Sequence, residues 1–324
     1  MSGKRAAGSA RGKIMTVRGP VPPADLGFTL PHEHILVDFI GADKASPDRY
    51  EAEDVVRVVL PYLKQARELG CRTLFECTPA YLGRDVRLLE RLSSLSGLTL
   101  VTNTGYYGAA KDKSVPRHAF EESAGQLADR WTREWENGID GTMIRPGFIK
   151  TGVDGAPLSA IDAKLVRAAA LTHLRTGLTI ASHTGGGKAA LEQSEILKEE
   201  GVAGRAWIWV HAQTEKDTEI HAQAAAQGAW LEFDGIGPAS VEQHVDFVLD
   251  MKRRKLLGRV MASHDAGWYR VGEPGGGAFR AYDTLFTDFL PALKKAGLAD
   301  AEIRQLTVTN PAAAFAIGVK AVSR

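Results

Sequence analysis

The sequence contains few cysteines, few aromatic residues and no excess of charge of either sign. Only two of its 324 residues are cysteines, and aromatic residues make up 7% of the chain. The net charge is +1, from 40 basic and 39 acidic residues dispersed along the sequence. This balance excludes the broad basic surface that nucleic acid or an anionic membrane would need. We therefore expect a small-molecule substrate as the partner, with no nucleic acid and no membrane.

Long apolar runs are also missing, since no stretch approaches the roughly 20 consecutive apolar residues of a membrane helix. Residues 1–13 are basic and lack the apolar segment of a secretory signal, so we interpret them as a disordered leader. The two cysteines, Cys71 and Cys77, bracket a predicted strand that would hold them roughly 20 Å apart, beyond disulfide reach. Free thiols are typical of a reducing compartment, which predicts a cytoplasmic location.

Short apolar runs alternate with amphipathic segments of helical length along the whole chain. Apolar strands separated by helices predict an α/β fold with a parallel sheet, and eight such units favour a closed (β/α)₈ TIM barrel over an open doubly wound sheet. No linker divides the chain, so we expect residues 14–324 to form a single domain. The predicted strands are 27–34, 72–77, 98–103, 144–150, 178–183, 206–211, 229–234 and 259–265.

The first predicted strand ends in Pro-His-Glu-His, residues 31–34. Alternation along a strand places His32 and His34 on one face and Glu33 on the other. An isolated pair of this kind is more often two partly exposed histidines than a metal site, so the pair needs support from other strands. Five of the eight predicted strands end in a group that can bind metal, and these groups are His32 and His34, Lys150, His183, His211 and Asp265. In a barrel the carboxyl ends of all strands meet at one rim, where active sites form.

Four histidines and a carboxylate suit zinc or a similar ion. Five ligands exceed the usual three of a catalytic zinc site, so either one ion is five-coordinate or two ions share the ligands. A protonated Lys150 beside divalent ions would be strongly repelled. It is therefore either a structural lysine that points away, which the local sequence favours, or a lysine carboxylated by carbon dioxide that bridges two metals.

Several segments beyond these ligands occur in an order that resembles the phosphotriesterase-like family of the amidohydrolase superfamily, which includes phosphotriesterases and lactonases. The resemblance extends from about residue 14 onward and combines the ligand pattern with separate motifs. These motifs are GRD at 83–85, TGYYG at 104–108, GFIKTGVDG at 147–155, GGGKAALEQSEILKEEGV at 185–202 and NPAAAF at 310–315.

The resemblance implies a binuclear metal centre and two divalent ions, zinc in the first instance, with Mn, Co or Fe as alternatives. Its metal ligands would be His32, His34, Lys150, His183, His211 and Asp265. His32 and His34 would bind the more buried ion, and His183 and His211 the more exposed ion. N6-carboxylated Lys150 would bridge the two ions. A hydroxide shared by the ions would be the nucleophile, and Asp265 would be the catalytic base.

Two aromatic residues are candidates for substrate binding. Tyr107 follows the third predicted strand, where related lactonases place a tyrosine over the metal centre, and Trp268 lies on the loop after the eighth. Gly235 departs from the family pattern, because some lactonases and phosphotriesterases carry a basic residue after the aspartate that Asp234 matches. The resemblance also implies a homodimer.

The sequence thus predicts a metal-dependent hydrolase, with a lactone or another carboxylic ester as the leading substrate class. Phosphotriester hydrolysis (aryldialkylphosphatase activity) and N-acyl amide hydrolysis on the same metal centre are alternatives within the superfamily. From a different class, a non-catalytic binding barrel would be signalled by lost ligands, and none of the ligand positions is lost.

Overall fold

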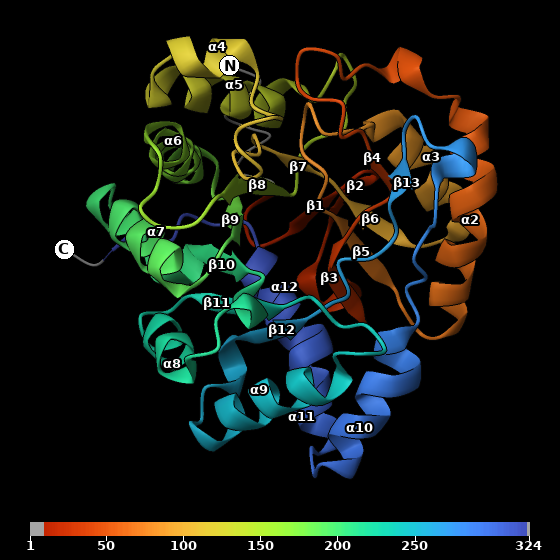
Figure 1. The fold of residues 1–324 in the computed structure, drawn as a ribbon, viewed down its shortest axis with the longest axis vertical. Helices are drawn as coiled ribbons and strands as arrows, with labels where there is room; N and C mark the ends of the chain where they lie inside the picture. The colour runs from red at the N-terminus through yellow and green to blue at the C-terminus, as the bar shows by residue number, and fades with distance from the viewer. Residues whose placement is uncertain (1–9, 323–324) are drawn as a thin grey trace.

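Parallel strands occupy the centre of the molecule and helices surround them (Figure 1). The structure is a computed structural model that describes residues 10–322. Six strands form one sheet in the order β12-β11-β10-β9-β8-β7, and three form another in the order β3-β5-β6. The strands are β1 (Ile14–Thr16), β2 (Gly19–Val21), β3 (Thr29–Glu33), β4 (Leu36–Val37), β5 (Thr73–Glu76), β6 (Thr99–Val101), β7 (Asn103–Thr104), β8 (Phe148–Val153), β9 (Thr179–Thr184), β10 (Trp207–Val210), β11 (Trp230–Phe233), β12 (Val260–Ala262) and β13 (Tyr269–Arg270).

The two sheets join into a closed barrel. On one side β6 and β7 are a single run interrupted only at Thr102. On the other side β12 and β3 are connected near their carboxyl ends, where the amide of Asp265 donates to the carbonyl of His32 at 3.2 Å and the amide of His32 donates to Ser263 Oγ at 3.1 Å. The predicted (β/α)₈ TIM barrel is confirmed.

The helices cover the barrel with their apolar sides, and some of them begin or end at favourable caps. Asp85 caps the start of α3 and Gly97 ends it in the left-handed conformation. Ser123 and Gln126 form a capping box at the start of α5. The helices are α2 (Ala52–Glu68), α3 (Val86–Ser96), α4 (Arg117–Glu121), α5 (Ala124–Asn137), α6 (Ala160–Thr176), α7 (Gly187–Glu199), α8 (Thr218–Ala226), α9 (Val241–Arg253), α10 (Leu290–Lys295), α11 (Asp300–Arg304) and α12 (Asn310–Phe315). None of the described helices is long and apolar enough to cross a membrane.

Apolar side chains fill the barrel interior below the rim. The rings of Phe75 and Phe315 stack at 3.9 Å, and Phe148 lies 5.7 Å from Phe75. The barrel interior is therefore packed at this level, and the cavity described below lies above it, at the carboxyl ends of the strands. Cys71 and Cys77 are buried free thiols, as the sequence predicts.

Residues 1–9 of the predicted leader lie outside the described part of the chain. The rest of that segment contacts the fold, since Ala10 is buried and the carbonyl of Lys13 accepts a hydrogen bond from the amide of Ile317 at 2.9 Å. Residues 10–13 therefore pack against the C-terminal segment.

The fourth barrel strand differs from its predicted position at 144–150. It spans Phe148–Val153, because Pro146 has no amide hydrogen and Gly147 instead donates to the carbonyl of Thr102 at 2.8 Å. Lys150 is therefore the third residue of β8 and not its last. Its side chain starts deeper in the barrel than the sequence alone predicts.

Candidate metal centre at the barrel rim

All six predicted ligand residues line one cavity at the carboxyl end of the barrel. Three of them lie within strands: His32 in β3, Lys150 in β8 and His183 in β9. His34 and His211 directly follow strands, and Asp265 lies three residues beyond β12. The cavity has a volume of about 70 Å³, and its wall includes His32, His34, Lys150, His183, His211 and Asp265.

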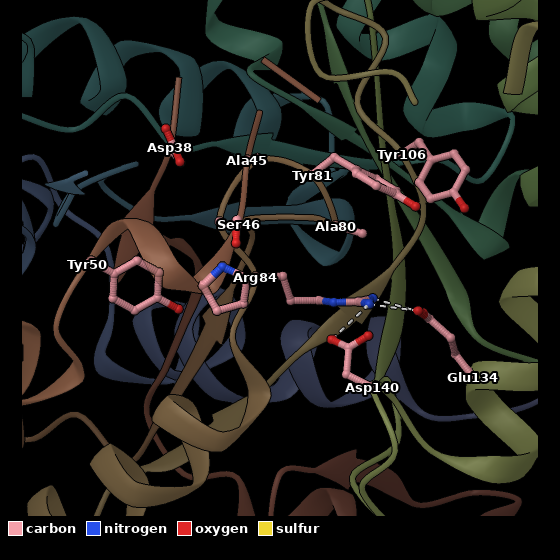
Figure 2. A pocket seen from close by; sticks show the side chains of 12 residues that line it. Asp38, Ala45, Ser46, Tyr50, Ala80, Tyr81, Arg84, Tyr106, Glu134 and Asp140 are labelled. Carbon is pink, nitrogen blue, oxygen red and sulfur yellow. Dashed lines mark hydrogen bonds and ion pairs between the residues drawn. The ribbon is translucent and has the colours of Figure 1, made fainter. Parts of the chain in front are cut away.

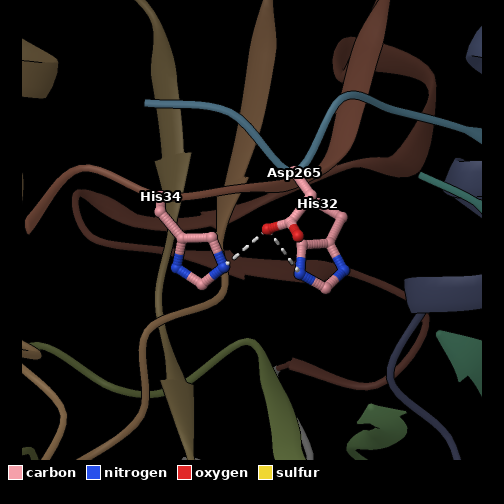
Figure 3. A group of neighbouring side chains, drawn as sticks. All are labelled: His32, His34 and Asp265. Carbon is pink, nitrogen blue, oxygen red and sulfur yellow. Dashed lines mark ion pairs between the residues drawn. The ribbon is translucent and has the colours of Figure 1, made fainter. Parts of the chain in front are cut away.

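His32, His34 and Asp265 form the first group, with the carboxylate between the two imidazoles (Figure 3). Asp265 Oδ1 lies 3.1 Å from His34 Nε2 and 3.7 Å from His32 Nε2. This buried oxygen nevertheless accepts no well-directed hydrogen bond. On the other side of its ring, His34 Nδ1 lies 2.7 Å from Thr78 Oγ1, which fixes the ring with Nε2 toward Asp265.

His211 and His183 form a second pair of imidazoles, with ring centroids 4.4 Å apart. Asp234 fixes His211 from behind, because Asp234 Oδ1 accepts from His211 Nδ1 at 2.6 Å and Oδ2 accepts from the His211 amide at 3.1 Å. His211 is itself in the left-handed region, at φ +63°. A non-glycine residue keeps such a conformation only where its surroundings impose it.

Two buried carboxylates, Glu232 in β11 and Asp234 directly after it, support the histidines from outside the cavity. His32 Nδ1 lies 3.1 Å from Glu232 Oε2 and 3.2 Å from Asp234 Oδ2. Burial opposes charge on His32, but the charge of Asp234 and hydrogen bonds with Asp234 and Glu232 raise the pKa of His32 to about 10. Burial raises the pKa of Glu232 to about 7, and its Oε1 has no hydrogen-bond partner among the described residues. This side of the site therefore favours positive charge.

Lys150 is 1% exposed and projects into the cavity wall. Its ammonium nitrogen has a hydrogen bond to the carbonyl of Thr151 at 3.2 Å and lies 5.4 Å from the centre of the Tyr107 ring. Burial lowers the pKa of the Lys150 amine. Among the described residues, no carboxylate forms an ion pair with it, so Lys150 lacks the partner that a structural buried lysine usually has.

Both predicted substrate-binding aromatic residues also line the cavity. Tyr107 Oη lies 3.0 Å from His183 Nδ1. The ring of Trp268 lies 4.8 Å from that of His34 and 5.5 Å from that of Phe39, and its indole nitrogen donates to the carbonyl of Asp265 at 2.9 Å. Trp268 thus contacts both the cavity and the backbone that carries Asp265.

At Gly235, the position that departs from the family pattern, another side chain fills the space. A Cβ atom on Gly235 would lie 2.7 Å from Gln213 Nε2. Gln213 uses this position to hold Asp234, donating to Asp234 Oδ1 at 2.8 Å and accepting from the Asp234 amide at 3.2 Å. The amide of Gln213 therefore occupies the space in which a side chain at position 235 would begin.

Figure 2 shows a second and larger cavity, of about 280 Å³. It is lined by chain neighbours of the residues that line the cavity of the six predicted ligands, which we call the metal-site cavity. Neighbouring residues face the two cavities alternately: Asp38, Tyr81 and Tyr106 line the larger one, whereas Phe39, Leu82 and Tyr107 line the smaller. Arg84 crosses the larger cavity and forms two hydrogen bonds with Glu134, at 2.6 and 2.8 Å. Arg84 thus joins two parts of the cavity wall.

The residues at the smaller cavity fit divalent ions. They offer imidazole nitrogens and carboxylate oxygens, the donors that zinc accepts. Asp265 Oδ1 is a buried acceptor left without a donor between two imidazoles. Each of His32, His34 and His211 is held through Nδ1 by a carboxylate or hydroxyl, which is how proteins usually orient metal-binding histidines.

Sequence reasoning missed the supporting residues Glu232, Gln213 and Thr78. Glu232 and Asp234 share the i, i+2 spacing of the two histidines at 32 and 34, so the segment LEFD carried a signal for one of them. Thr78 and Gln213 carry no local signal, because their partners are 44 and 21 residues away.

Comparisons with known proteins find relatives that match nearly the whole chain. The chain is 30% identical over 293 residues to the "Phosphotriesterase homology protein" of Escherichia coli (strain K12), which covers 89% of this chain and 98% of that one. It is 27% identical to the aryldialkylphosphatase of Saccharolobus solfataricus, and the match covers 89% of this chain and 94% of that one. A solved structure from the engineering of organophosphate hydrolysis on a weak promiscuous lactonase template superposes with a TM-score of 0.83 at 25% identity, covering 94% and 99%.

The model of the Phosphotriesterase family matches residues 12–315, nearly the whole chain. The matched range contains every residue of the metal-site cavity and of its supporting network. Family and relatives together indicate a hydrolase. The chain belongs to the Phosphotriesterase family.

Proposed function

We propose that this protein is a binuclear metal hydrolase that cleaves a neutral carboxylic ester, in the first instance a lactone. The observation that carries the proposal is the single cavity that gathers His32, His34, Lys150, His183, His211 and Asp265. Bound there, two divalent ions, zinc in the first instance, would supply an activated water nucleophile and polarise the scissile carbonyl.

The proposed ligand roles follow the positions of the side chains. One ion would be bound by His32, His34 and Asp265. The other ion would be bound by His183 and His211. We propose that Lys150 is carboxylated on Nζ and joins the ions, because its amine is buried in the cavity wall and has no carboxylate partner among the described residues. Carboxylation would turn a cation that repels metal into an anion that binds it.

Asp265 is the group best placed to move the proton. Water adds to the carbonyl carbon, the bond from that carbon to the ring oxygen breaks, and the proton passes through the Asp265 carboxylate to the departing alkoxide. The product of a lactone is then a hydroxy acid. Tyr107 and Trp268 would contact the substrate above this group.

The cavity wall argues for a neutral substrate. Lys150 is the only basic side chain among the residues that line the cavity besides histidines, and it is assigned to the metals. Besides the six proposed ligands, the wall consists of uncharged residues, namely Val37, Phe39, Cys77, Leu82, Tyr107 and Trp268. An N-acyl amino acid brings a carboxylate that no side chain here would pair with, and burying an unpaired charge is costly. Phosphotriesters are neutral and remain the second candidate, but Gly235 provides no basic contact for the phosphoryl group.

The test is metal analysis of the purified protein together with turnover of lactones, aryl esters, N-acyl amino acids and phosphotriesters. We expect about two ions per chain and the highest kcat/KM on lactones. Preferential hydrolysis of N-acyl amino acids would contradict the neutral substrate class. Less than one tightly bound ion and no turnover would instead favour a binding barrel. We further propose a homodimer in the cytoplasm, which sedimentation and fractionation would test.

A further inference from the structure

We propose that Glu33 and His264 form a clamp that sets the direction of Asp265. The inference rests on the proposed function only in treating Asp265 as the base and metal ligand. Glu33 is the middle residue of the Pro-His-Glu-His motif, and its side chain points away from the cavity to a fully buried position. Neither Glu33 nor His264 lines the metal-site cavity, so each would act as a positioning residue.

The carboxylate of Glu33 receives every one of its described hydrogen bonds from the segment that surrounds Asp265. Its Oε1 accepts from Ser263 Oγ at 2.8 Å and from His264, through the amide at 3.0 Å and Nδ1 at 2.6 Å. Its Oε2 accepts from the amide of Ala266 at 2.7 Å. The residues before and after Asp265 are thus fixed to one carboxylate, which leaves Asp265 to face the other way.

His264 connects this carboxylate to the next part of the chain. Its Nε2 lies 2.9 Å from the amide nitrogen of Leu285, which can only donate, so Nε2 is the acceptor. The ring proton is therefore on Nδ1 and is donated to Glu33. Since the side chain is 1% exposed, water cannot replace either bond.

The clamp holds a backbone that would otherwise relax. Asp265 has φ +53°, in the left-handed region that a residue other than glycine keeps only where its surroundings impose it. Its carbonyl accepts from Arg280 Nη1 at 2.8 Å and from the Trp268 indole at 2.9 Å. In this conformation Asp265 Oδ1 lies 3.1 Å from His34 Nε2. Release of the neighbouring amides would let the residue turn away from the histidines.

A matched histidine elsewhere in the molecule provides the control. His173 in α6 is also fully buried, donates through Nδ1 to the carbonyl of Leu178 at 2.7 Å and accepts through Nε2 from the amide of Lys320 at 2.9 Å. It has the same tautomer as His264 and also accepts from a backbone amide, but its Nδ1 partner is a backbone carbonyl and it has no link to the cavity. Both glutamine variants lose the packing of a buried ring and the hydrogen bond of Nδ1, and His173→Gln controls for that shared loss.

The experiment compares His264→Gln, His264→Asn and His173→Gln. Glutamine keeps an acceptor where Nε2 lies and loses the donor to Glu33, whereas asparagine keeps a donor where Nδ1 lies. For His264→Gln we expect zinc affinity, from chelator competition, and kcat at saturating zinc each to fall about 10–100-fold, with little change in KM. His264→Asn should recover much of both, and His173→Gln should lower Tm alone. A His264→Gln protein with unchanged zinc affinity and kcat would overturn the clamp.

Glu33→Gln is the second variant, should His264→Gln fail to fold. Its amide NH₂ would confront a backbone N–H group where a carboxylate oxygen now accepts, so we expect the same losses. A crystal structure of this variant without metal gives an independent measurement: Asp265 should no longer face His34. If Asp265 did not move in this variant, the clamp would be overturned, whether or not the unaltered protein binds zinc. If the unaltered protein bound no zinc, that result would count against the proposed function alone.

Discussion

The two cavities at the barrel rim share a wall but differ in how their charged groups are satisfied. In the larger cavity, oppositely charged or hydrogen-bonding side chains pair with one another: Arg84 with Glu134, Arg49 with Asp38 and Tyr50 with Asp85. In the smaller cavity Lys150 has no described ion pair and Asp265 Oδ1 has no well-directed donor. Unpaired buried groups are costly unless a ligand satisfies them. The smaller cavity is therefore the better candidate for function, although its volume is a quarter of the other.

The sharpest test of this difference is Lys150→Ala. Removal of the proposed bridge leaves two cations without the anion that offsets their repulsion, so metal content should fall and kcat should drop by more than about 10⁴-fold, beyond the usual loss of a general base. Added short carboxylic acids should restore part of the activity by filling the space of the lysine. Unchanged metal content and turnover would show Lys150 to be a structural lysine.

Asp265→Asn should have the next largest effect. Asparagine retains the shape but cannot accept the proton, so we expect kcat to fall about 10²–10⁴-fold while most of the metal stays bound to the histidines. Metal analysis and steady-state kinetics on one preparation separate the two effects. A metal-replete variant that turns over normally would exclude Asp265 as the base.

Trp268→Ala should change substrate preference more than rate. Loss of the ring opens the wall beside His34 and Phe39, so the ratio of kcat/KM between a bulky aryl ester and a small lactone should shift roughly tenfold toward the larger substrate. Metal content should stay at the level of the unaltered protein. Equal ratios in both proteins would remove Trp268 from the substrate site.

Glu134→Gln tests the larger cavity and should have the smallest effect on turnover. It replaces the carboxylate that pairs with the buried Arg84, so the free energy of unfolding should fall by about 2–3 kcal/mol. Because this pair lies outside the metal-site cavity, kcat and KM on lactones should remain within about twofold of their original values. A loss of kcat comparable to that of Asp265→Asn would mean that the larger cavity takes part in the reaction.

Much of the fold and the ligand set could be predicted because both depend on local patterns. Apolar runs mark the barrel strands, and a polar residue at or just beyond a strand end marks the rim, as at His183 and His211. The position of Lys150 within its strand was wrong, because Pro146 and Gly147 delay the start of β8, and the amide of Gly147 bonds to a carbonyl 45 residues earlier in the chain.

The supporting network could not be predicted in the same way. Glu33 is adjacent to two predicted ligands, yet its partners are 230 to 233 residues away and meet it only because β3 and β12 close the barrel. Strand alternation indicates that Glu33 faces away from the cavity, but not what it contacts. Such contacts are a property of the closed ring and have no signature in either segment alone.

The contact between Gln213 and Gly235 has a consequence for how this site could evolve. A residue larger than glycine at 235 would collide with the Gln213 amide, which also holds Asp234 beside His211. An arginine introduced first would therefore disturb the histidine before it could reach a substrate, whereas a smaller residue at 213 introduced first would open the space. The two positions should show strong epistasis, so that paths toward a phosphotriester specialist are open in one mutational order and closed in the other.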